Sequence, residues 1–319
     1  MSKKRAIIID ALNMYFRSYT SNPSISLQGL PIGGTKGFLT SLQKLCRDLK
    51  PDKVVIVWDG PGGSRRRKSK NKSYKEGRSP IRLNRNVRSL TDEEEMQNKV
   101  WQQARLIEYL NLLPVSQIMV DGVEADDVIA YACQILPDYN KIIVSNDKDF
   151  IQLCNHDTIL FRPTQGETLN KNRVIEQYGI SPNWFALARA IAGDKSDNLP
   201  GVPGIGLKTI AKRFPFFNDP HKASCFYKLY EHCRENIDGV KVYGNILENR
   251  KLIESNHNLM QLYAPSFSPS SKRYIRESVH DLRAEFNKTG IEKMMNEDGF
   301  DYMNWSDLKA HMNKIVADN

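Results

Sequence analysis

The sequence predicts an α/β fold in which a mainly parallel sheet is flanked by helices and is followed by a helical region. In the first half of the chain, short apolar runs typical of buried strands alternate with segments of helical periodicity, the pattern of a parallel sheet covered by helices. Near Gly179 the strand signals almost cease and helix signals take over. The 319 residues fit about two domains, because one hydrophobic core stops growing at roughly 250 residues. We therefore expect one domain over residues 1–178 and a helical region over residues 179–319.

The first half contains five predicted strands, at residues 6–10, 54–59, 117–120, 142–147 and 158–161. Between the first two, apolar residues recur at helical spacing from Phe38 to Leu49. Residues 91–94 form a capping box that begins a further helix, and residues 125–136 carry the apolar stripe of another.

The second half reads as a series of helices. Ser181 and Pro182 are an N-cap and a first helical position, and a glycine-rich turn at 201–206 precedes a helix at 207–214. Breaks are expected at Pro220, at Gly239 and in a Pro/Ser-rich loop at 265–271. An apolar stripe near the end has two interpretations, a surface for a partner or a packed core face, and we favour the core. The stripe consists of Leu308, Met312 and Ile315.

Composition excludes several protein classes. The longest apolar runs fall far short of the roughly 18 residues that cross a bilayer, and the apolar run after the basic start is too short for a signal peptide. Five cysteines form no CxxC pair, and with six scattered histidines they give neither a zinc site nor a disulfide framework. We expect a protein of a reducing cytoplasm, without a membrane partner.

The basic charge is concentrated in one segment. Residues 61–90 hold eleven lysines and arginines against Glu76 alone, a local charge of +10, whereas the whole chain carries +9. The other residues are therefore close to neutral in sum. Such a segment is directed at a polyanion, although a solvated loop or a localisation patch has the same composition.

Nine carboxylates are expected to meet in one cleft. Three predicted strands end in Asp10, Asp59 and Asp147, and the carboxyl ends of parallel strands open into one crevice. Singly, such acids complement helix dipoles or bond their own backbone, but nine together would repel strongly in a low dielectric. Hard divalent cations with oxygen ligands relieve that repulsion, and without nearby His or Cys they would be Mg²⁺ or Mn²⁺. The other six acids are Asp149, Glu124, Asp126, Asp127, Asp194 and Asp197.

A cleft of this kind next to a basic segment indicates phosphodiester hydrolysis. Bound metal ions polarise a phosphoryl oxygen and lower the pKa of a bound water, while lysines and arginines hold the polyanion.

Four segments resemble the signatures of the structure-specific 5′ nucleases: flap endonucleases, the 5′-nuclease domain of bacterial DNA polymerase I and the bacteriophage 5′-3′ exonucleases. They are residues 74–78 (YKEGR), 122–127 (GVEADD), 145–149 (SNDKD) and 193–206 (GDKSDNLPGVPGIG), within a match over about 5–215. A chain without a polymerase domain looks most like the bacteriophage type.

The resemblance implies a PIN-like or resolvase-like nuclease core with a helical arch at about 61–100. A helix-hairpin-helix would follow at about 182–214, then a C-terminal helical extension. It implies two metal ions, the first held by Asp10, Asp59, Glu124 and Asp126 with Asp127 close, the second by Asp147, Asp149, Asp194 and Asp197. Lys75 and Arg78 would hold the scissile phosphate beside the catalytic ligands Asp126 and Asp149. The hairpin would also hold K⁺. The implied DNA contacts are Arg17, Arg67 or Lys68, Tyr74, Lys75, Arg78, Gly201, Gly204, Gly206 and Lys208.

The implied reaction is hydrolysis near 5′ ends and at flap junctions of DNA, or of RNA primers paired to DNA, during replication and primer removal. The chain would act as a monomer on branched, 5′-ended or RNA-primed duplexes in a bacterial cytoplasm, that of a phage-infected host. From Phe216 onward no family motif or clamp-binding box is visible, so docking to a single-strand binding protein or a clamp is an open expectation. Two alternatives are a catalytically inactive DNA binder and a general PIN-type ribonuclease.

Overall fold

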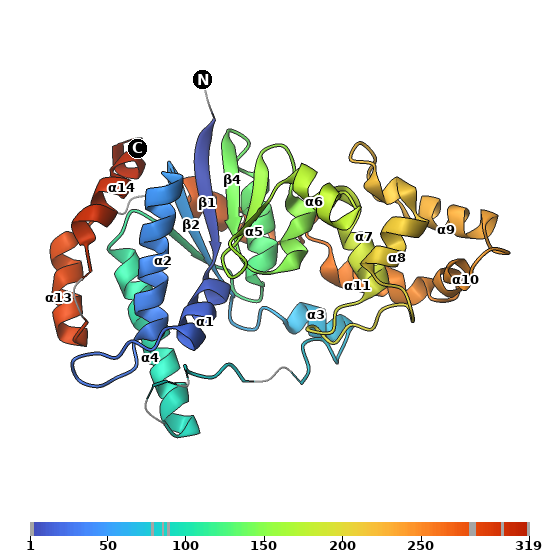
Figure 1. Ribbon diagram of the computed structural model, residues 1–319. Coiled ribbons are helices and arrows are strands. Elements are labelled where there is room, and N and C mark those ends of the chain that lie inside the picture. Colours follow the sequence, from blue (N-terminus) through green and yellow to red (C-terminus); the bar gives the residue numbers. More distant parts are fainter. Residues whose placement is uncertain are drawn as a thin grey trace.

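The computed structural model describes residues 3–77, 80–84, 86–87, 90–280, 285–300 and 303–317. A six-stranded sheet forms its centre, in the order β3-β2-β1-β4-β5-β6 (Figure 1). The first five strands are parallel and β6 is antiparallel to β5. All five predicted strands are present, but the one predicted over 142–147 ends at Val144, and Asp147 is the N-cap of the following 3₁₀ helix. β6 was not predicted, because a strand of three residues is too short to leave a clear pattern in the sequence. The bounds are β1 (Lys4–Asp10), β2 (Lys53–Trp58), β3 (Ser116–Met119), β4 (Tyr139–Val144), β5 (Thr158–Arg162) and β6 (Glu167–Leu169).

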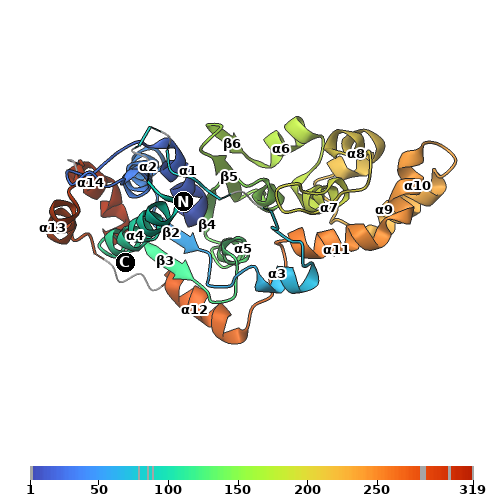
Figure 2. The ribbon, with the colours of Figure 1, turned by 90° about the horizontal axis from the view of Figure 1, so that it is seen from below.

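Helices cover both faces of the sheet. On one face, Ile7, Ile9 and Ile56 pack against α1 (Ala11–Ser21), α2 (Gly33–Leu49) and α4 (Asp92–Asn111). On the other face, Ile8 and Val55 pack against α5 (Ala125–Gln134) (Figure 2). Successive residues of a strand point to opposite faces, so strands buried on both faces read as the continuous apolar runs seen in the sequence. The predicted capping box of α4 is present.

The apolar cluster on the α5 face continues into the second half of the chain. It includes Trp184, Phe214, Ile246 and Ile253. The predicted helix starts at Pro182 and Leu207 are confirmed. The helices and short 3₁₀ segments are η1 (Lys148–Leu153), α6 (Lys171–Tyr178), α7 (Pro182–Ala192), α8 (Leu207–Arg213), η2 (Pro215–Asn218), α9 (Phe226–Glu235), α10 (Lys241–Glu248) and α11 (Arg250–Met260).

One predicted loop is shorter than expected. The expectation of a loop over 265–271 was wrong at its end, because α12 (Pro269–His280) begins at Pro269. Ser268 accepts a hydrogen bond from the backbone N–H of Ser271 at 3.0 Å, and proline is favoured at a first helical position. α12 lies along β3 at the edge of the sheet (Figure 2).

The last two helices return to the first half of the chain. α14 (Trp305–Ala317) lies beside α2, and α13 (Lys288–Asp298) is joined to α4 by an ion pair between Asp298 and Arg105 (Figure 1). Leu308, Met312 and Ile315 are buried there, so their interpretation as a core stripe is confirmed. Residues 291–315 thus share a core with α2 and α4, and the division at residue 178 stays a prediction.

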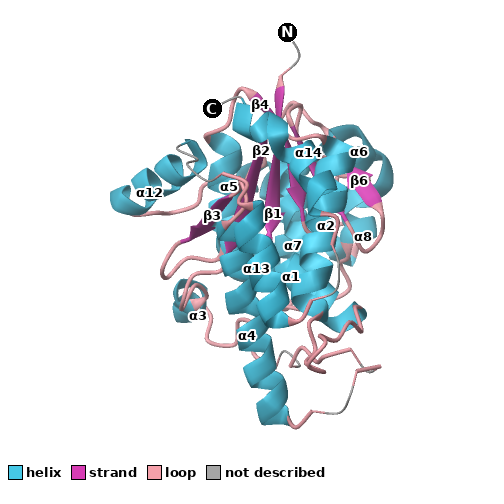
Figure 3. Ribbon diagram, turned by 90° about the vertical axis from the view of Figure 1, so that its left-hand side faces the viewer, coloured by secondary structure: helices cyan, strands magenta, loops and turns pink. Residues whose placement is uncertain are grey.

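The basic segment crosses below the carboxyl edge of the sheet. It includes α3 (Arg65–Lys70), and its described residues from Asn71 onward form no helix. It leads to α4, whose N-terminal part extends beyond the body of the molecule (Figure 3). We call residues 61–90 the basic strap. Among the described residues, no helix is both long and apolar enough to cross a membrane.

Candidate active site

Asp10 stands where β1 ends and α1 begins. Its side chain accepts hydrogen bonds from the backbone N–H of Asn13 at 3.1 Å and from Ser145 Oγ at 2.9 Å. Burial raises the pKa of Asp10 to about 7, and the charges of Asp59 and Asp147 add to the rise, against the two hydrogen bonds. A nearby cation would stabilise the ionised form of such a buried carboxyl group.

The end of β2 is hydrogen-bonded to the start of α5. Asp59 follows β2 directly and accepts a hydrogen bond from the backbone N–H of Ala125 at 2.7 Å. Glu124 is the N-cap residue of α5, and Asp126 lies in the first turn with Asp127. Burial and the charges of neighbouring acids raise the pKa of Asp126 well above its usual value. These residues and Asp10 form the first acidic cluster: Asp10, Asp59, Glu124, Asp126 and Asp127.

Two neighbouring residues of the basic strap, Tyr74 and Lys75, are among those that contact Glu124. Lys75 Nζ donates to its Oε1 at 2.6 Å, and the Tyr74 hydroxyl donates to its Oε2 at 3.4 Å. The backbone of Lys75 adopts a positive φ of 58°, and its N–H donates to the carbonyl of Asp197 at 3.0 Å. Lys75 therefore links the first cluster to the turn after α7.

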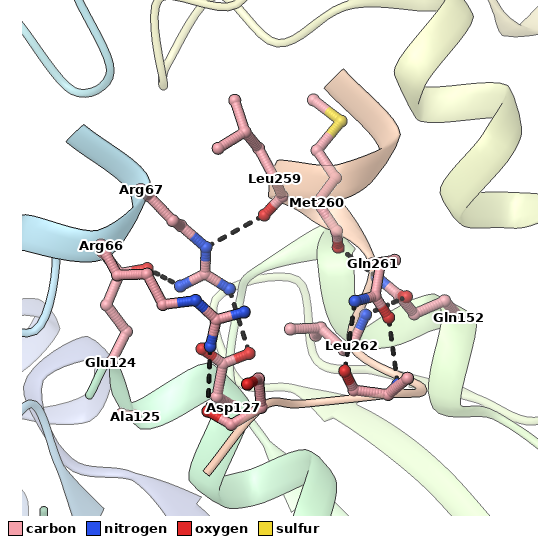
Figure 4. A network of polar contacts seen from close by, with 12 residues as sticks. Arg66, Arg67, Glu124, Ala125, Asp127, Gln152, Leu259, Met260, Gln261 and Leu262 are labelled. Atoms are coloured by element: carbon pink, nitrogen blue, oxygen red, sulfur yellow. Dashed lines mark hydrogen bonds and ion pairs between the residues drawn. The ribbon is translucent and has the colours of Figure 1, made fainter. Parts of the chain in front are cut away.

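Arg67 also faces the first cluster (Figure 4). Its guanidinium pairs with Glu124, contacts Asp127 at 3.3 Å and donates through Nε to the carbonyl of Leu259 at 3.0 Å. Only 11% of its side chain is exposed, whereas Lys68 is exposed. Of the two alternatives left open by the sequence, Arg67 is thus the one at the acids, and whether either binds DNA stays a prediction.

The second acidic cluster consists of Asp147, Asp149, Asp194 and Asp197. Asp147 caps η1 by accepting from the backbone N–H of Asp149 at 2.8 Å. Oxygens of Asp149, Asp194 and Asp197 all lie within 4.8 Å of one another. Burial raises the pKa of Asp149 to about 7, with Asp147 adding to the rise. All four donors are hard oxygens, so the set fits a divalent cation such as Mg²⁺ or Mn²⁺.

Asp194 is held by the turn that it begins. Oδ1 accepts from the backbone N–H of Ser196 at 2.8 Å and from its hydroxyl at 2.6 Å. Burial alone would raise the pKa of Asp194, but the bonds from Ser196 and the charge of Arg189 bring it below its usual value.

Sequence reasoning missed Arg189, which lies in the last turn of α7. Its Nε donates to Asp149 at 3.1 Å and a terminal N–H group donates to Asp194. One signal could have found it: an arginine among apolar residues on a helix needs a buried partner. The apolar residues around it are Trp184, Phe185, Ala186, Leu187, Ala188, Ala190 and Ile191.

The two clusters meet at the carboxyl edge of the sheet. The Ser145 hydroxyl donates to Asp10 and accepts from the backbone N–H of Asp147 at 3.1 Å. The charge of Asp147 also acts on Asp126. Hydrogen bonds and mutual charge effects therefore link the two clusters at this edge, and the role of the nine predicted acids as metal ligands stays a prediction.

The other predicted contact residues lie around this edge. Arg17, in α1, donates to Ser41 Oγ of α2 at 3.1 Å, so this bond is directed to α2 and not to the acids. Gly201 packs so closely that an added Cβ would lie 2.1 Å from the carbonyl of Ala192. Gly204 has a φ of +77°, and Gly206 precedes α8, which carries the exposed Lys208. Arg78 lies outside the described residues.

Comparisons with known proteins agree with this fold. Residues 5–179 match the family described as 5′-3′ exonuclease, N-terminal resolvase-like domain. The chain is 32% identical over 209 residues to a 5′-3′ exonuclease of Aquifex aeolicus, covering 65% of this chain and 67% of that one. It is 32% identical over 213 residues to thermostable DNA polymerase I of Thermus aquaticus, covering 66% of this chain and 24% of the polymerase.

Solved structures share the fold. The bacteriophage T5 flap endonuclease in complex with DNA and metal ions superposes with a TM-score of 0.65 at 18% identity, covering 92% of this chain and 99% of the phage protein. The T5 5′-exonuclease with bound zinc gives a TM-score of 0.61 at 19% identity, over 92% of this chain and 98% of that one.

Proposed function

Because this chain belongs to the 5′-3′ exonuclease family, we propose that it hydrolyses phosphodiester bonds near 5′ ends and at flap junctions, in DNA and in RNA primers paired to DNA. The observation that supports this most is the meeting of both acidic clusters at one edge of the sheet, with Lys75 in contact with both. The same edge faces the basic strap, which carries the positive charge of the chain.

Two divalent ions, Mg²⁺ or Mn²⁺, fit the donor set. Asp10, Asp59, Glu124 and Asp126 would hold one, with Asp127 close, and the second cluster would hold the other. When bound, such ions stabilise the attacking and leaving oxygens of an in-line displacement. The raised pKa values of Asp10 and Asp149 support this assignment, because a cation removes the electrostatic cost of ionising them.

Residues of the strap would bind the substrate at this edge. Lys75 would place its ammonium group at the scissile phosphate, and Tyr74, buried beside it, would keep Lys75 oriented. Arg78, three residues further, is proposed from the sequence motif to share that role. Arg17, Arg67 and Lys68 are proposed as further DNA contacts.

The turn from α7 to α8 is proposed to act as a helix-hairpin-helix that binds duplex DNA. Gly201 allows a close backbone approach to Ala192, Gly204 has a left-handed backbone, and the start of α8 has no side-chain cap, which makes it a favourable place for a phosphate. Gly206 and Lys208 would complete the contact, and K⁺ is the proposed ion of the turn. Residues 1–178 would thus carry most of the catalytic ligands and 179–319 duplex binding, although Asp194 and Asp197 of the second cluster belong to the latter and α13 and α14 share the first core.

Some expectations rest on the sequence alone and stay predictions. They are a monomeric state, docking to a single-strand binding protein or a clamp, a role in primer removal during replication, and action in the cytoplasm of a phage-infected bacterium.

One assay tests the proposed function. A 5′-labelled flap, a nicked duplex, an RNA-primed duplex and a single-stranded RNA are incubated with the chain in Mg²⁺ and in EDTA. We expect short labelled products from the first three in Mg²⁺ only. Binding without products would indicate an inactive DNA binder, and equal cleavage of single-stranded RNA would indicate a general ribonuclease.

A further inference from the structure

The second acidic cluster contains its own cation, Arg189. The side chain comes from a helix whose other inward residues are apolar, and only 14% of it is exposed. A charge this little exposed is stable only with ionised partners. Its partners are two of the three acids whose oxygens lie within 4.8 Å of one another.

The guanidinium joins acids from two separate elements. Its Nε donates to Oδ1 of Asp149 in η1, at 3.1 Å, and another N–H donates to Oδ2 of Asp194 in the turn after α7. The donors of an arginine have a rigid planar geometry, so the two carboxylates are held at a fixed separation. Since Oδ1 of Asp194 is already bonded to Ser196, this aspartate is fixed at both oxygens.

Arg189 also changes the charge of the cluster. Four ionised aspartates carry −4, and the guanidinium reduces this to −3. In the absence of a metal ion it offsets the repulsion among the acids, but it also repels any divalent cation a few ångströms away. The clamp favours metal binding in one respect, because two ligand side chains are already ordered before the ion binds. We expect the Coulombic repulsion between Arg189 and the ion to be the larger of the two effects.

We propose that Arg189 is a positioning residue of the second metal site, clamping Asp149 to Asp194 and offsetting their repulsion within the folded chain. This rests on the proposed function, since it needs a divalent cation at these carboxylates. It follows that Arg189 stabilises the fold most when no divalent cation is present, and that it orients the ligands while weakening metal affinity.

The test compares three variants of the full chain: Arg189→Gln, Arg189→Lys and Arg105→Gln. Arg105 is the matched control, because it is 19% exposed and joins Glu108 of α4 to Asp298 of α13, away from both clusters. Melting temperatures are measured without DNA in EDTA and in saturating Mg²⁺, and Mn²⁺ binding is followed by electron paramagnetic resonance. Single-turnover flap cleavage is measured at saturating Mg²⁺.

We expect Arg189→Gln to lose at least about 5 °C in EDTA and to recover at least half of that in Mg²⁺. The melting temperature of Arg105→Gln should fall by the same amount in EDTA and in Mg²⁺. The linkage between binding and stability requires tighter metal binding in the variant, so its second Mn²⁺ should bind at least about threefold tighter. Cleavage by Arg189→Gln should still fall at least about tenfold, because the ligands are no longer oriented.

An equal loss of melting temperature in EDTA and Mg²⁺, or weaker Mn²⁺ binding, overturns the proposal and leaves Arg189 a packing residue. If Arg189→Gln folds in neither condition, Arg189→Lys decides: it keeps the charge and loses the planar fork, so cleavage must fall while Mn²⁺ affinity stays normal. Normal cleavage by Arg189→Lys then overturns the proposal. A wild-type chain that binds no Mn²⁺ would instead refute the proposed function itself.

Discussion

The two acidic clusters are balanced by cations of different origin. At the first cluster the cations are Arg67 and Lys75, which belong to the basic strap. At the second cluster the cation is Arg189, which belongs to a helix packed into the core. A cation on the strap belongs to the segment proposed to hold the substrate, whereas a cation on α7 belongs to the packed fold. We therefore expect substrate binding to change the cation contacts of the first cluster more than those of the second.

The largest effect is expected from breaking the second cluster. Asp149→Asn removes one negative ligand and keeps the size of the side chain. If a metal ion there is worth several kcal/mol of transition-state stabilisation, single-turnover cleavage should fall at least about 1,000-fold. DNA binding should survive, because the strap and the α7–α8 turn are untouched. Asp121→Asn, at an exposed position outside both clusters, is the control. Wild-type cleavage by Asp149→Asn would show that the cluster does not take part.

The next effect separates catalysis from attraction within the strap. Lys75 lies at Glu124, whereas Lys72 is exposed three residues earlier. We expect Lys75→Ala to lower cleavage at saturating enzyme at least about 100-fold, the scale of losing one donor to the developing charge. Lys72→Ala should show weaker binding that added enzyme overcomes. Lys75→Arg should rescue only in part, because a planar fork does not replace a compact ammonium group. Equal small effects at both lysines would show that the strap only attracts DNA electrostatically and supplies no catalytic group.

The pH dependence of stability compares the clusters directly. Burial raises the pKa of Asp10 and of Asp149 to about 7, so the folded chain binds more protons than the unfolded chain between about pH 4 and pH 7. This contribution to stability is complete below the unfolded pKa and is lost as pH rises through 7. In EDTA the free energy of unfolding should therefore fall between about pH 4 and pH 7, and saturating Mg²⁺ should remove the fall.

Denaturant unfolding of Asp10→Asn and of Asp149→Asn then shows how much of the decrease in unfolding free energy each cluster causes. A free energy of unfolding that stays flat or rises with pH in EDTA would contradict the burial of these charges.

The smallest effect concerns exposed charges of the strap. Replacing Arg65, Lys68, Lys70 and Lys72 by Gln together should flatten the plot of log affinity for DNA against log salt, by about 0.7 to 0.9 per lost phosphate contact. Arg66 is left in place because it donates to the carbonyl of Ser266 at 2.9 Å. Catalysis at saturating enzyme should change little. An unchanged slope would place these side chains outside the interface.

Local and periodic signals made most of the fold predictable. The aspartates at the ends of β1 and β2 follow from the geometry of a parallel sheet, and the capping box of α4 from a four-residue pattern. The same geometry placed the nine acids together before any contact was known.

Long-range partners could not be predicted. The contacts of Arg67 with Leu259 and of Arg189 with Asp149 join residues far apart in the chain, and no spacing rule encodes them. No signal in the sequence indicated that α13 and α14 would return to the core of α2 and α4. An apolar stripe indicates that one face of a helix is buried, but it does not identify the element that covers it.

The position of α14 has a consequence for how the chain folds during synthesis. Gln43 of α2 donates to Asp307 of α14, 264 residues later, at 2.7 Å. While the chain is being made, the parts of α2 and α4 that pack against α13 and α14 stay uncovered until these two helices have been synthesised. Contacts of such sequence separation form slowly, and an apolar face left open is prone to aggregate. A nascent chain that stalls before residue 305 would therefore present this face to chaperones, and its release would depend on the last helices.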